Sequence, residues 1–252
     1  MHDKILAVVL AAGKGTRLHS AETDLPKVLR PAAGRPLLEW VLDELSFIPK
    51  KSIVIVIGYR GDKLLGAFPD YAFAEQKEQL GTGHAVMSAR RYIEALPSDA
   101  PVLICCGDMP LMRRQSYKAL LREHFEKGND CTLLSGALEN PHGYGRVIRS
   151  KDGAFLRIVE EKDCTEDERA VREVNSGVYV FRACALLPAL ERLGRCNAQG
   201  EYYLTDAPAY ILEDGGNVGA VCACSGFELL GVNTPEQLIK VESLLKNNGR
   251  RL

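Results

Sequence analysis

A glycine-rich segment near the N-terminus combines residue types that can bind phosphate. Residues Leu10–Arg17 read LAAGKGTR and directly follow a run of apolar residues. Gly13 and Gly15 let the backbone approach an anion closely and point N–H groups at it. Arg17 can grip phosphate oxygens with two parallel hydrogen bonds, and Lys27 adds a point charge further along. The segment therefore predicts a phosphate-binding loop, with a plain strand-to-helix turn as the alternative.

The loop matches neither of two common phosphate-binding patterns. It lacks Gly-Lys-[Ser/Thr] after four spacer residues, so it is not a Walker P-loop. Arg17 and Leu18 follow Thr16, so Gly-x-Gly-x-x-Gly is missing as well. Lys14 adds to the charge of the loop and is equally compatible with a position in solvent. The loop needs support from residues elsewhere before it identifies a function.

The elements that position the loop alternate between strand and helix. Apolar runs ended by glycine or proline predict strands buried on both faces, and apolar residues at helical spacing predict the helices between them. The predicted strands are Lys4–Leu10, Ser52–Ile57, Pro101–Cys106 and Cys131–Leu138, and the predicted helices are Leu37–Ile48, Gly81–Leu96 and Arg114–Lys127. This order predicts an α/β fold with a Rossmann-like, doubly wound, mostly parallel sheet. Ligands bind outside the carboxyl ends of such strands, which is where the glycine-rich loop falls.

The pattern changes in the second half of the chain. Short strands are predicted at Arg146–Ser150, Phe155–Glu160 and Val174–Phe181, and they indicate a small β-rich lobe laid over the sheet. Helices at Cys184–Leu193 and Tyr203–Glu213, strands at Val218–Cys224 and Leu229–Val232, and a helix at Pro235–Lys246 follow. We expect one domain over residues 1–252. Its core comprises about residues 1–138 and 184–233, its lobe residues 139–183, and its C-terminal helix residues 234–252.

The composition excludes several classes of protein. The chain has 252 residues, 46% of them hydrophobic and 26% charged, with a formal net charge of −1. This balance argues against a general nucleic-acid or membrane-surface binder. The longest apolar run, Ile5–Ala12, is far shorter than the roughly 18 residues of a membrane span and lacks signal-peptide features, so we expect a cytoplasmic protein. The eight cysteines show no metal-ligand spacing, which predicts mostly buried, inert thiols in a reducing compartment.

Further motifs make the glycine-rich loop specific. The loop and the Pro26–Leu29 segment (PKVL) together resemble the signature of the sugar-phosphate nucleotidyltransferases, which join a sugar 1-phosphate to a nucleoside triphosphate and release pyrophosphate. The later motifs are QKEQLGTGHA at residues 76–85, GDMPL at 107–111, YGR at 144–146, IVEEKD at 158–163, EVNSG at 173–177, NAQGEYYLTD at 197–206 and GVN at 231–233. From Ile5 to about Leu244 the chain is similar to the uridylyltransferase domains of the bacterial N-acetylglucosamine-1-phosphate uridylyltransferases, and Asn197–Asp206 is the most specific element.

The resemblance implies transfer of UMP from UTP to N-acetylglucosamine 1-phosphate, with Mg²⁺ as cofactor, giving UDP-N-acetylglucosamine and pyrophosphate. In that family a left-handed β-helix acetyltransferase domain commonly follows. This sequence shows no β-helix repeat, so we expect only the nucleotidyltransferase domain. UTP and a sugar 1-phosphate are the expected partners, without nucleic acid or membrane, and we expect a monomer or a weak homo-oligomer.

The resemblance also implies roles for individual residues. Arg17 and Lys27 would be catalytic, stabilising the triphosphate and the departing pyrophosphate. Asp108 and Asn233 would hold Mg²⁺, although an aspartate before Pro110 also suits a turn or a helix cap. The implied nucleotide-binding residues are Leu10, Ala11, Ala12, Gly13, Gly15, Gln76, Gln79, Gly81 and Thr82. A side-chain amide can both donate to and accept from uracil, which suits the two glutamines.

The sugar phosphate is expected to bind Gly145, Glu160, Asn175 and Thr205, by the same resemblance. No covalent nucleophile is expected, because the chain has no Gly-x-Ser-x-Gly and no cysteine with a clear base partner. His84 belongs to one of the motifs and is expected either to contact the ligand or only to orient the helix that follows.

Three features depart from the family pattern. Residues 18–26 form a longer stretch than usual between the two catalytic cations, which affects how Lys27 reaches the phosphates. Arg30-Pro31 replaces a histidine that often follows PKVL, and Cys106 stands where some relatives have an aromatic residue. Two other readings therefore stay open: a nucleotidyltransferase for another sugar 1-phosphate or nucleotide, and a nucleotide-sugar-binding module without catalysis.

Overall fold

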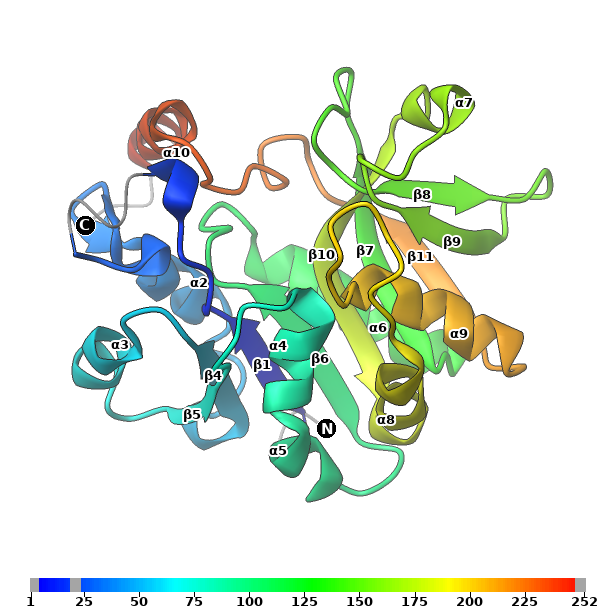
Figure 1. Cartoon of the computed structure of the whole chain (residues 1–252), viewed down its shortest axis with the longest axis horizontal. Helices are drawn as coiled ribbons and strands as arrows, with labels where there is room; N and C mark the ends of the chain where they lie inside the picture. Colours follow the sequence, from blue (N-terminus) through cyan, green and yellow to red (C-terminus); the bar gives the residue numbers. More distant parts are fainter. Residues whose placement is uncertain (1–4, 19–23, 248–252) are drawn as a thin grey trace.

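A mixed sheet runs through the centre of the computed structural model, which describes residues 5–18 and 24–247 (Figure 1). Within these residues the sheet has nine strands, and seven of them lie in the order β11-β7-β10-β6-β1-β4-β5. These are β1 (Leu6–Leu10), β4 (Ile53–Ile57), β5 (Ala72–Glu75), β6 (Pro101–Cys106), β7 (Cys131–Ala137), β10 (Glu173–Arg182) and β11 (Val218–Cys222). The hairpin of β8 (Arg146–Arg149) and β9 (Phe155–Val159) extends the sheet from the start of β10.

The predicted doubly wound, mostly parallel sheet is confirmed. β1 pairs in parallel with β4 and β6, β4 with β5, and β7 with β11. β10 runs antiparallel between β6 and β7. We expected Val174–Phe181 in the β-rich lobe, but residues Tyr179–Arg182 pair with β6 at the centre of the sheet. An apolar run predicts a strand buried on both faces and leaves open which neighbours that strand joins.

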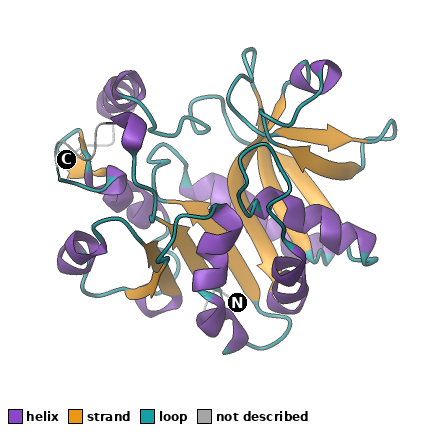
Figure 2. Cartoon of the chain, viewed as in Figure 1, coloured by secondary structure: helices purple, strands orange, loops and turns teal. Residues whose placement is uncertain are grey.

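Helices cover both faces of the sheet (Figures 1 and 2). α4 (Thr82–Ser88), α5 (Arg90–Glu94), α8 (Ala183–Arg192) and α9 (Ala207–Glu213) pack on one face, and α2 (Leu37–Glu44), α3 (Gly61–Ala67) and α6 (Arg114–Lys127) pack on the other. Successive side chains of β1 point to opposite faces, so Val8 belongs to the first core while Ala7 and Val9 belong to the second. This double burial explains why β1 reads as a continuous apolar run.

A third, smaller hydrophobic core packs α10 (Pro235–Asn247) against the segment that follows the glycine-rich loop. α10 packs against the hairpin of β2 (Pro31–Ala32) and β3 (Arg35–Pro36), with Val241 and Leu245 buried beside Trp40. The indole Nε1 of Trp40 donates to the Ala32 carbonyl oxygen at 3.0 Å, which satisfies the polar atom of this buried side chain. The final helix is thereby joined to the segment that follows the glycine-rich loop.

Several predicted element boundaries were wrong. The helix expected over Gly81–Leu96 is divided into α4 and α5 at Ala89, where the backbone leaves helical geometry. Leu229–Val232 is a loop and not a strand. Its terminal residues are buried by packing, which produced the strand-like pattern. The first turn of the helix expected over Tyr203–Glu213 is the 3₁₀-helix η5 (Leu204–Asp206). The sequence reading missed α3, β5 and the short helix α7 (Glu166–Arg169).

All eight cysteines are free thiols. Cys105, Cys131 and Cys164 are buried, whereas Cys184, Cys196 and Cys222 are exposed, so the prediction of mostly buried thiols was wrong. Cys222 lies at the end of β11, an edge strand with solvent beside it. Burial raises the pKa of the Cys105 thiol to about 12 and keeps it protonated and unreactive.

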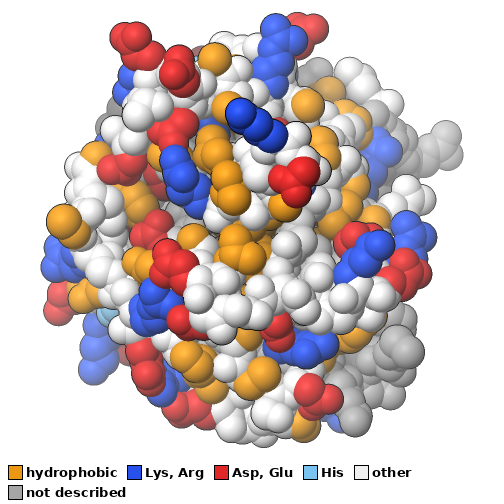
Figure 3. Space-filling view, turned by 90° about the vertical axis from the view of Figure 1, so that its right-hand side faces the viewer, with side chains coloured by type: hydrophobic (Ala, Val, Ile, Leu, Met, Phe, Trp, Pro, Cys, Tyr) orange, Lys and Arg blue, Asp and Glu red, His pale blue; other side chains and the backbone are white. Residues whose placement is uncertain are grey.

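The surface is mixed in charge. Lys and Arg side chains are interspersed with Asp and Glu over the face shown in Figure 3, in line with the formal net charge of −1. Across residues 5–18 and 24–247, every helix is too short or too polar to traverse a lipid bilayer.

His124 makes the fold sensitive to acid. The side chain is buried on α6, and its Nδ1 lies 3.0 Å from Thr132 Oγ1. Burial, with a smaller contribution from Arg182, lowers the pKa of His124 to about 4. The unfolded state then binds more protons than the folded state between about pH 6.5 and pH 4. Stability should therefore fall as the pH falls through this window, by up to about 3 kcal/mol from this group.

Urea unfolding of the wild type and His124→Gln between pH 7 and pH 4.5 measures this effect. We expect the free energy of unfolding of the wild type to decline more steeply than that of the variant. The comparison uses slopes, because the variant also changes the contact with Thr132 at neutral pH. Parallel curves for the two proteins would show that His124 is not responsible.

Candidate active site

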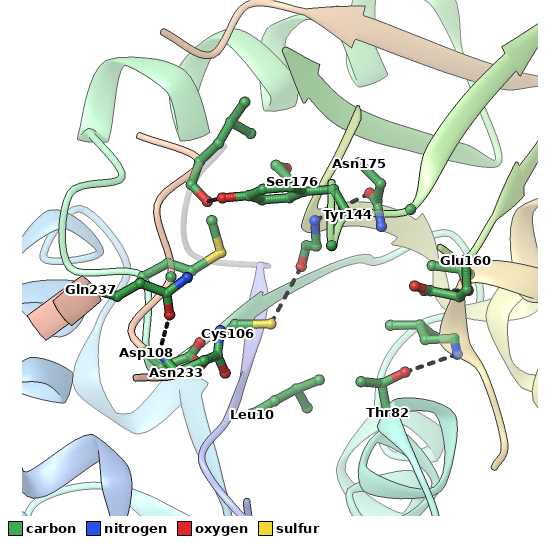
Figure 4. Close-up of a pocket in the computed structure, with 18 of the residues that line it drawn as sticks. Leu10, Thr82, Cys106, Asp108, Tyr144, Glu160, Asn175, Ser176, Asn233 and Gln237 are labelled. Atoms are coloured by element: carbon green, nitrogen blue, oxygen red, sulfur yellow. Dashed lines mark hydrogen bonds between the residues drawn. The ribbon is translucent and has the colours of Figure 1, made fainter. Parts of the chain in front are cut away.

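Two cavities adjoin at the carboxyl ends of β1 and β6. The lobe cavity has a volume of about 420 Å³ and is lined partly by the loops around the β8–β9 hairpin. The loop cavity has a volume of about 260 Å³ and is lined by the glycine-rich loop and the start of α4. Among the described residues, four line both cavities: Leu10, Thr82, Cys106 and Asp108 (Figure 4). Molecules bound in the two cavities would therefore meet beside Asp108.

The loop cavity collects the predicted nucleotide-binding residues. Its lining includes Leu10, Ala11, Ala12, Gly13, Gln76, Gln79, Gly81, Thr82 and the catalytic candidate Lys27. The glycine-rich loop is held to the sheet by a hydrogen bond from the Ala11 N–H to the Val56 carbonyl oxygen at 2.9 Å. Gly15 lines neither cavity. Its φ of +63° shows that it serves the turn of the loop.

The amide of Gln76 is oriented by its neighbours. The side chain is buried, and its Nε2 donates to the Gly81 carbonyl oxygen at 3.0 Å. The same Nε2 lies 3.2 Å from Nδ1 of His84. Because a carbonyl oxygen can only accept, the amide nitrogen must face Gly81, and Oε1 is the group left for a ligand. His84 lines neither cavity, and it braces Gln76 and stacks on Tyr202 with ring centroids 6.1 Å apart.

The Asn197–Asp206 segment holds the rim of the loop cavity. The Gly83 N–H donates to the Tyr202 carbonyl oxygen at 2.8 Å, and the Leu204 N–H donates to Thr82 Oγ1 at 3.1 Å. Gly81 has a φ of +114°, and a Cβ there would lie 2.6 Å from the Tyr202 carbonyl oxygen. The close backbone approach and the positive φ explain why glycine occupies this position.

All four predicted sugar-binding residues line the lobe cavity. Gly145 precedes β8, Glu160 follows β9, Asn175 lies on β10 and Thr205 lies in η5. Thr205 Oγ1 donates to Glu160 Oε1 at 3.0 Å. Burial raises the pKa of Glu160, while the bond from Thr205 partly offsets that effect. Segments far apart in the sequence thus meet around one cavity.

A bulge in β10 turns its residues toward the lobe cavity. The pairing with β7 shifts register between Asn175 and Val178, and Gly177 has a φ of +73°. Asn175 Oδ1 accepts from the Gly177 N–H at 3.1 Å, and Nδ2 donates to the Tyr179 hydroxyl at 2.6 Å. Bulges commonly re-aim side chains beside active sites, and this one fixes the direction of Asn175.

The two predicted metal ligands converge on one cation, the ammonium of Lys27. Its Nζ donates to Asp108 Oδ2 and, at 3.0 Å, to Asn233 Oδ1. Arg17, the other catalytic candidate, lines the lobe cavity. The long stretch between the two cations lies partly outside the described residues, at positions 19–23. Beyond it, Asp24 is anchored by ion pairs to Arg60 and Lys63 at 3.0 and 2.9 Å.

Asn233 is held by the first turn of α10. Gln237 Oε1 accepts from the Asn233 N–H at 2.7 Å and from the Thr234 N–H at 3.1 Å. Thr234 Oγ1 in turn accepts from the Gln237 N–H at 3.3 Å. This reciprocal arrangement is a capping box with glutamine in the third position. The Thr-x-x-Gln spacing is visible in the sequence and could have revealed Gln237, which also lines the lobe cavity.

Sequence reasoning missed other residues that line the cavities. They are Met109, His142, Gly143, Tyr144, Ser176, Gly177, Tyr179, Leu204, Leu229 and Gly231 in the lobe cavity, Val28, Ala85 and Glu201 in the loop cavity, and Cys106 in both. Many of them lie within the sequence motifs, next to residues that were predicted to bind substrate. That neighbouring position could have identified them as lining residues. Leu229 could not be identified in this way. It lies in a loop beside the lobe cavity, and an apolar residue outside the motifs does not indicate a binding position.

Comparison with known proteins identifies the family of this chain. Residues 7–206 match the model of the MobA-like NTP transferase domain, so the chain belongs to the NTP transferase family. Within it, the chain is 41% identical over 245 residues to the bifunctional protein GlmU of Thermoanaerobacter pseudethanolicus, covering 97% of this chain and 52% of that protein. GlmU of Bacillus velezensis is 42% identical over 247 residues, with coverage of 97% and 53%. The chain thus spans about half the length of these curated relatives.

A solved structure shares the fold. It is described as a putative glucose-1-phosphate thymidylyltransferase from Bacillus anthracis in complex with a sucrose, and it aligns with a TM-score of 0.72 over 96% of each chain. Its sequence is 18% identical to this one, so the likeness concerns architecture alone. The family match and the GlmU relatives confirm the predicted nucleotidyltransferase class, and the solved structure confirms the predicted fold.

Two glycines of the loop cavity should respond differently to substitution. Gly81→Ala should destabilise the ligand-free protein by more than about 2 kcal/mol, because it combines a positive φ with a clash against backbone. Gly13→Ala is the matched control, since a Cβ there meets nothing within 4 Å, and its stability should change by less than about 0.5 kcal/mol. Urea unfolding without ligand measures both. Equal stability of the two variants would contradict the assignment of Gly81 as a packing position.

Proposed function

We propose that this chain transfers UMP from UTP to N-acetylglucosamine 1-phosphate, giving UDP-N-acetylglucosamine and pyrophosphate, with Mg²⁺ as cofactor. The observation that carries the proposal is the pair of adjoining cavities that share Asp108. A nucleotide in the loop cavity and a sugar phosphate in the lobe cavity would bring their phosphates together at the sheet edge. The motif resemblance and the GlmU relatives support this choice of substrates.

The oriented amide of Gln76 supports recognition of uracil. Its Nε2 is used by Gly81 and His84, which leaves Oε1 to accept from the base. Uracil carries an N–H donor at its N3 position, whereas cytosine carries an acceptor there. Leaving two acceptors face to face in a buried pocket costs both of them a hydrogen bond. We therefore infer selection of UTP over CTP, and thymine, which shares the N–H, belongs in the same test.

The chemistry needs charge neutralisation more than proton transfer. An oxygen of the sugar phosphate attacks the α-phosphorus of UTP, and the bond from that phosphorus to the bridging oxygen of pyrophosphate breaks. No proton is lost or gained in this exchange, so the residues must bring two anions together in line. Lys27 and Arg17 supply positive charge from the two cavities, and the backbone near Gly13 supplies N–H donors.

Asp108 and Asn233 suit a hard divalent cation. Their side-chain oxygens already converge on the ammonium of Lys27, and this contact supports the proposal that a cation binds at that place. Mg²⁺ is commonly held by one or two protein oxygens, with phosphate oxygens and water completing its shell. When bound, it would neutralise phosphate charge and orient the reacting groups.

A panel of substrates tests the proposal. Pyrophosphate release is measured with Mg²⁺ and UTP, CTP or dTTP, and with the 1-phosphates of N-acetylglucosamine, glucose and N-acetylgalactosamine. We expect strong preference for UTP with N-acetylglucosamine 1-phosphate. Asp108→Asn and Asn233→Ala should each lower turnover by roughly a hundredfold or more with the fold intact.

Other results would redirect the assignment. Preference for another sugar or base would keep the reaction and change the specificity. Tight UTP binding without pyrophosphate release from any sugar phosphate would indicate a binding module without catalysis. Near-wild-type rates in Asp108→Asn at limiting Mg²⁺ would remove the metal assignment.

Glu160 should separate the two substrates kinetically. Because Glu160 lines only the lobe cavity, Glu160→Ala should raise the KM for the sugar phosphate more than the KM for UTP. Burial raises the pKa of Glu160, so protonation should weaken sugar binding at a pH above the usual range of a glutamate. The wild-type KM for the sugar phosphate should rise as the pH falls through that pKa. Equal changes in both KM values would argue against a role on the sugar side.

A further inference from the structure

The ammonium of Lys27 lies between the side-chain oxygens of Asp108 and Asn233, the two residues proposed to hold the metal. Lys27 Nζ donates to Asp108 Oδ2 and to Asn233 Oδ1, and the Lys27 and Asp108 side chains are only 14% and 16% exposed. With so little solvent around them, the ammonium and carboxylate are weakly screened. A lysine has three donors and no acceptor, so it can satisfy these oxygens, and its positive charge competes with a second cation for them.

The backbone on both sides of this contact is fixed. Lys27 begins the 3₁₀-helix η3 (Lys27–Leu29), and the next residue, Val28, is buried. A Cβ on Gly107 would lie 3.4 Å from Val28 Cγ1, so the segment before Asp108 packs directly on η3. The Val232 N–H donates to the Asp108 carbonyl oxygen at 3.0 Å, which ties the Asn233 loop to the same point. The oxygens therefore stay together whichever cation they hold.

The side chain of Lys27 can also adopt a second position, in the loop cavity. It lines the loop cavity, which Gly13 of the glycine-rich loop also lines. An ammonium on a flexible four-carbon stem can move from a carboxylate to a nearby phosphate without any change of backbone. A nucleotide in the loop cavity would offer Lys27 new anionic partners and leave Asp108 and Asn233 free.

We propose that Lys27 is an internal cation that keeps a divalent metal from Asp108 and Asn233 until a nucleotide draws its ammonium away. The proposal rests on the proposed function, because it takes these two residues as the metal ligands. Without nucleotide, the metal must displace Lys27 and place its charge beside an ammonium. With nucleotide, the same lysine binds phosphate. Metal and nucleotide then favour each other's binding by the same factor, as linkage requires.

Manganese binding without nucleotide tests this competition. Free Mn²⁺ is measured by electron paramagnetic resonance in titrations of the wild type, Lys27→Met, Lys14→Met and the double variant Lys27→Met/Asp108→Asn. Methionine keeps a long unbranched side chain and removes the charge. Lys14 is exposed in the glycine-rich loop, so its variant controls for the loss of one nearby positive charge. Circular dichroism and thermal unfolding confirm that each variant is folded.

We expect Lys27→Met to bind Mn²⁺ at least about tenfold more tightly than the wild type, and Lys14→Met to stay within about threefold of it. The double variant should lose the gain. Affinity of Lys27→Met equal to that of the wild type, or no measurable binding in either, would overturn the proposal. Retention of the gain in the double variant would overturn it together with the metal assignment. An Asp108-dependent gain in a chain that releases no pyrophosphate would uphold the competition and reject the proposed activity.

The reverse coupling is measured with UTP in the presence of EDTA. Asp108→Asn should bind UTP more tightly than the wild type, because Lys27 is released. Removing one negative charge would also favour UTP, so the same substitution is made in the Lys27→Met background, where the gain should be several-fold smaller. The difference between the two gains isolates the contribution of Lys27. Equal gains in both backgrounds would contradict the proposal.

Discussion

The parallel pairing of β1 with β6 is the constraint on which the site depends. It brings the carboxyl ends of both strands to one edge, where the Gly107 N–H donates to the Leu10 carbonyl oxygen at 2.9 Å. The glycine-rich loop leaves the sheet from one strand and Asp108 follows the other. The glycine-rich loop and Asp108 are therefore neighbours because the pairing of the two strands places them together, whatever their side chains are.

The second requirement is that two cavities keep a fixed relation to each other, and the Asn197–Asp206 segment provides it. Its backbone holds the rim of the loop cavity through Gly83 and Thr82, while Thr205 donates to Glu160 in the lobe cavity. The same stretch of chain therefore contacts residues of both cavities. The most specific motif in the sequence therefore acts mainly by positioning its neighbours. Thr205 is the one residue of this motif that was predicted to bind the sugar phosphate.

Much of the fold could be predicted because its signals are local. Strands buried on both faces, such as β1 and β6, need continuous apolar runs, and the strand-to-helix alternation shows their order. The failures also have local causes. Ala89 divides a helix whose apolar spacing continues through it, and Leu229 and Val232 are buried in a loop that pairs with no strand. The position of β10 depends on its neighbours, which its own apolar pattern does not identify.

By itself the sequence determined the class of protein, located the glycine-rich loop at the sheet edge and identified about half of the residues that line the two cavities. Motifs preserve those residue types and their spacing along the chain. Only the tertiary structure decided how they use their hydrogen bonds. The donors of Gln76 are taken by Gly81 and His84, and the ammonium of Lys27 lies between Asp108 and Asn233, which are 81 and 206 positions away. Such contacts depend on how separate strands and loops pack in space, and spacing along one chain does not encode them.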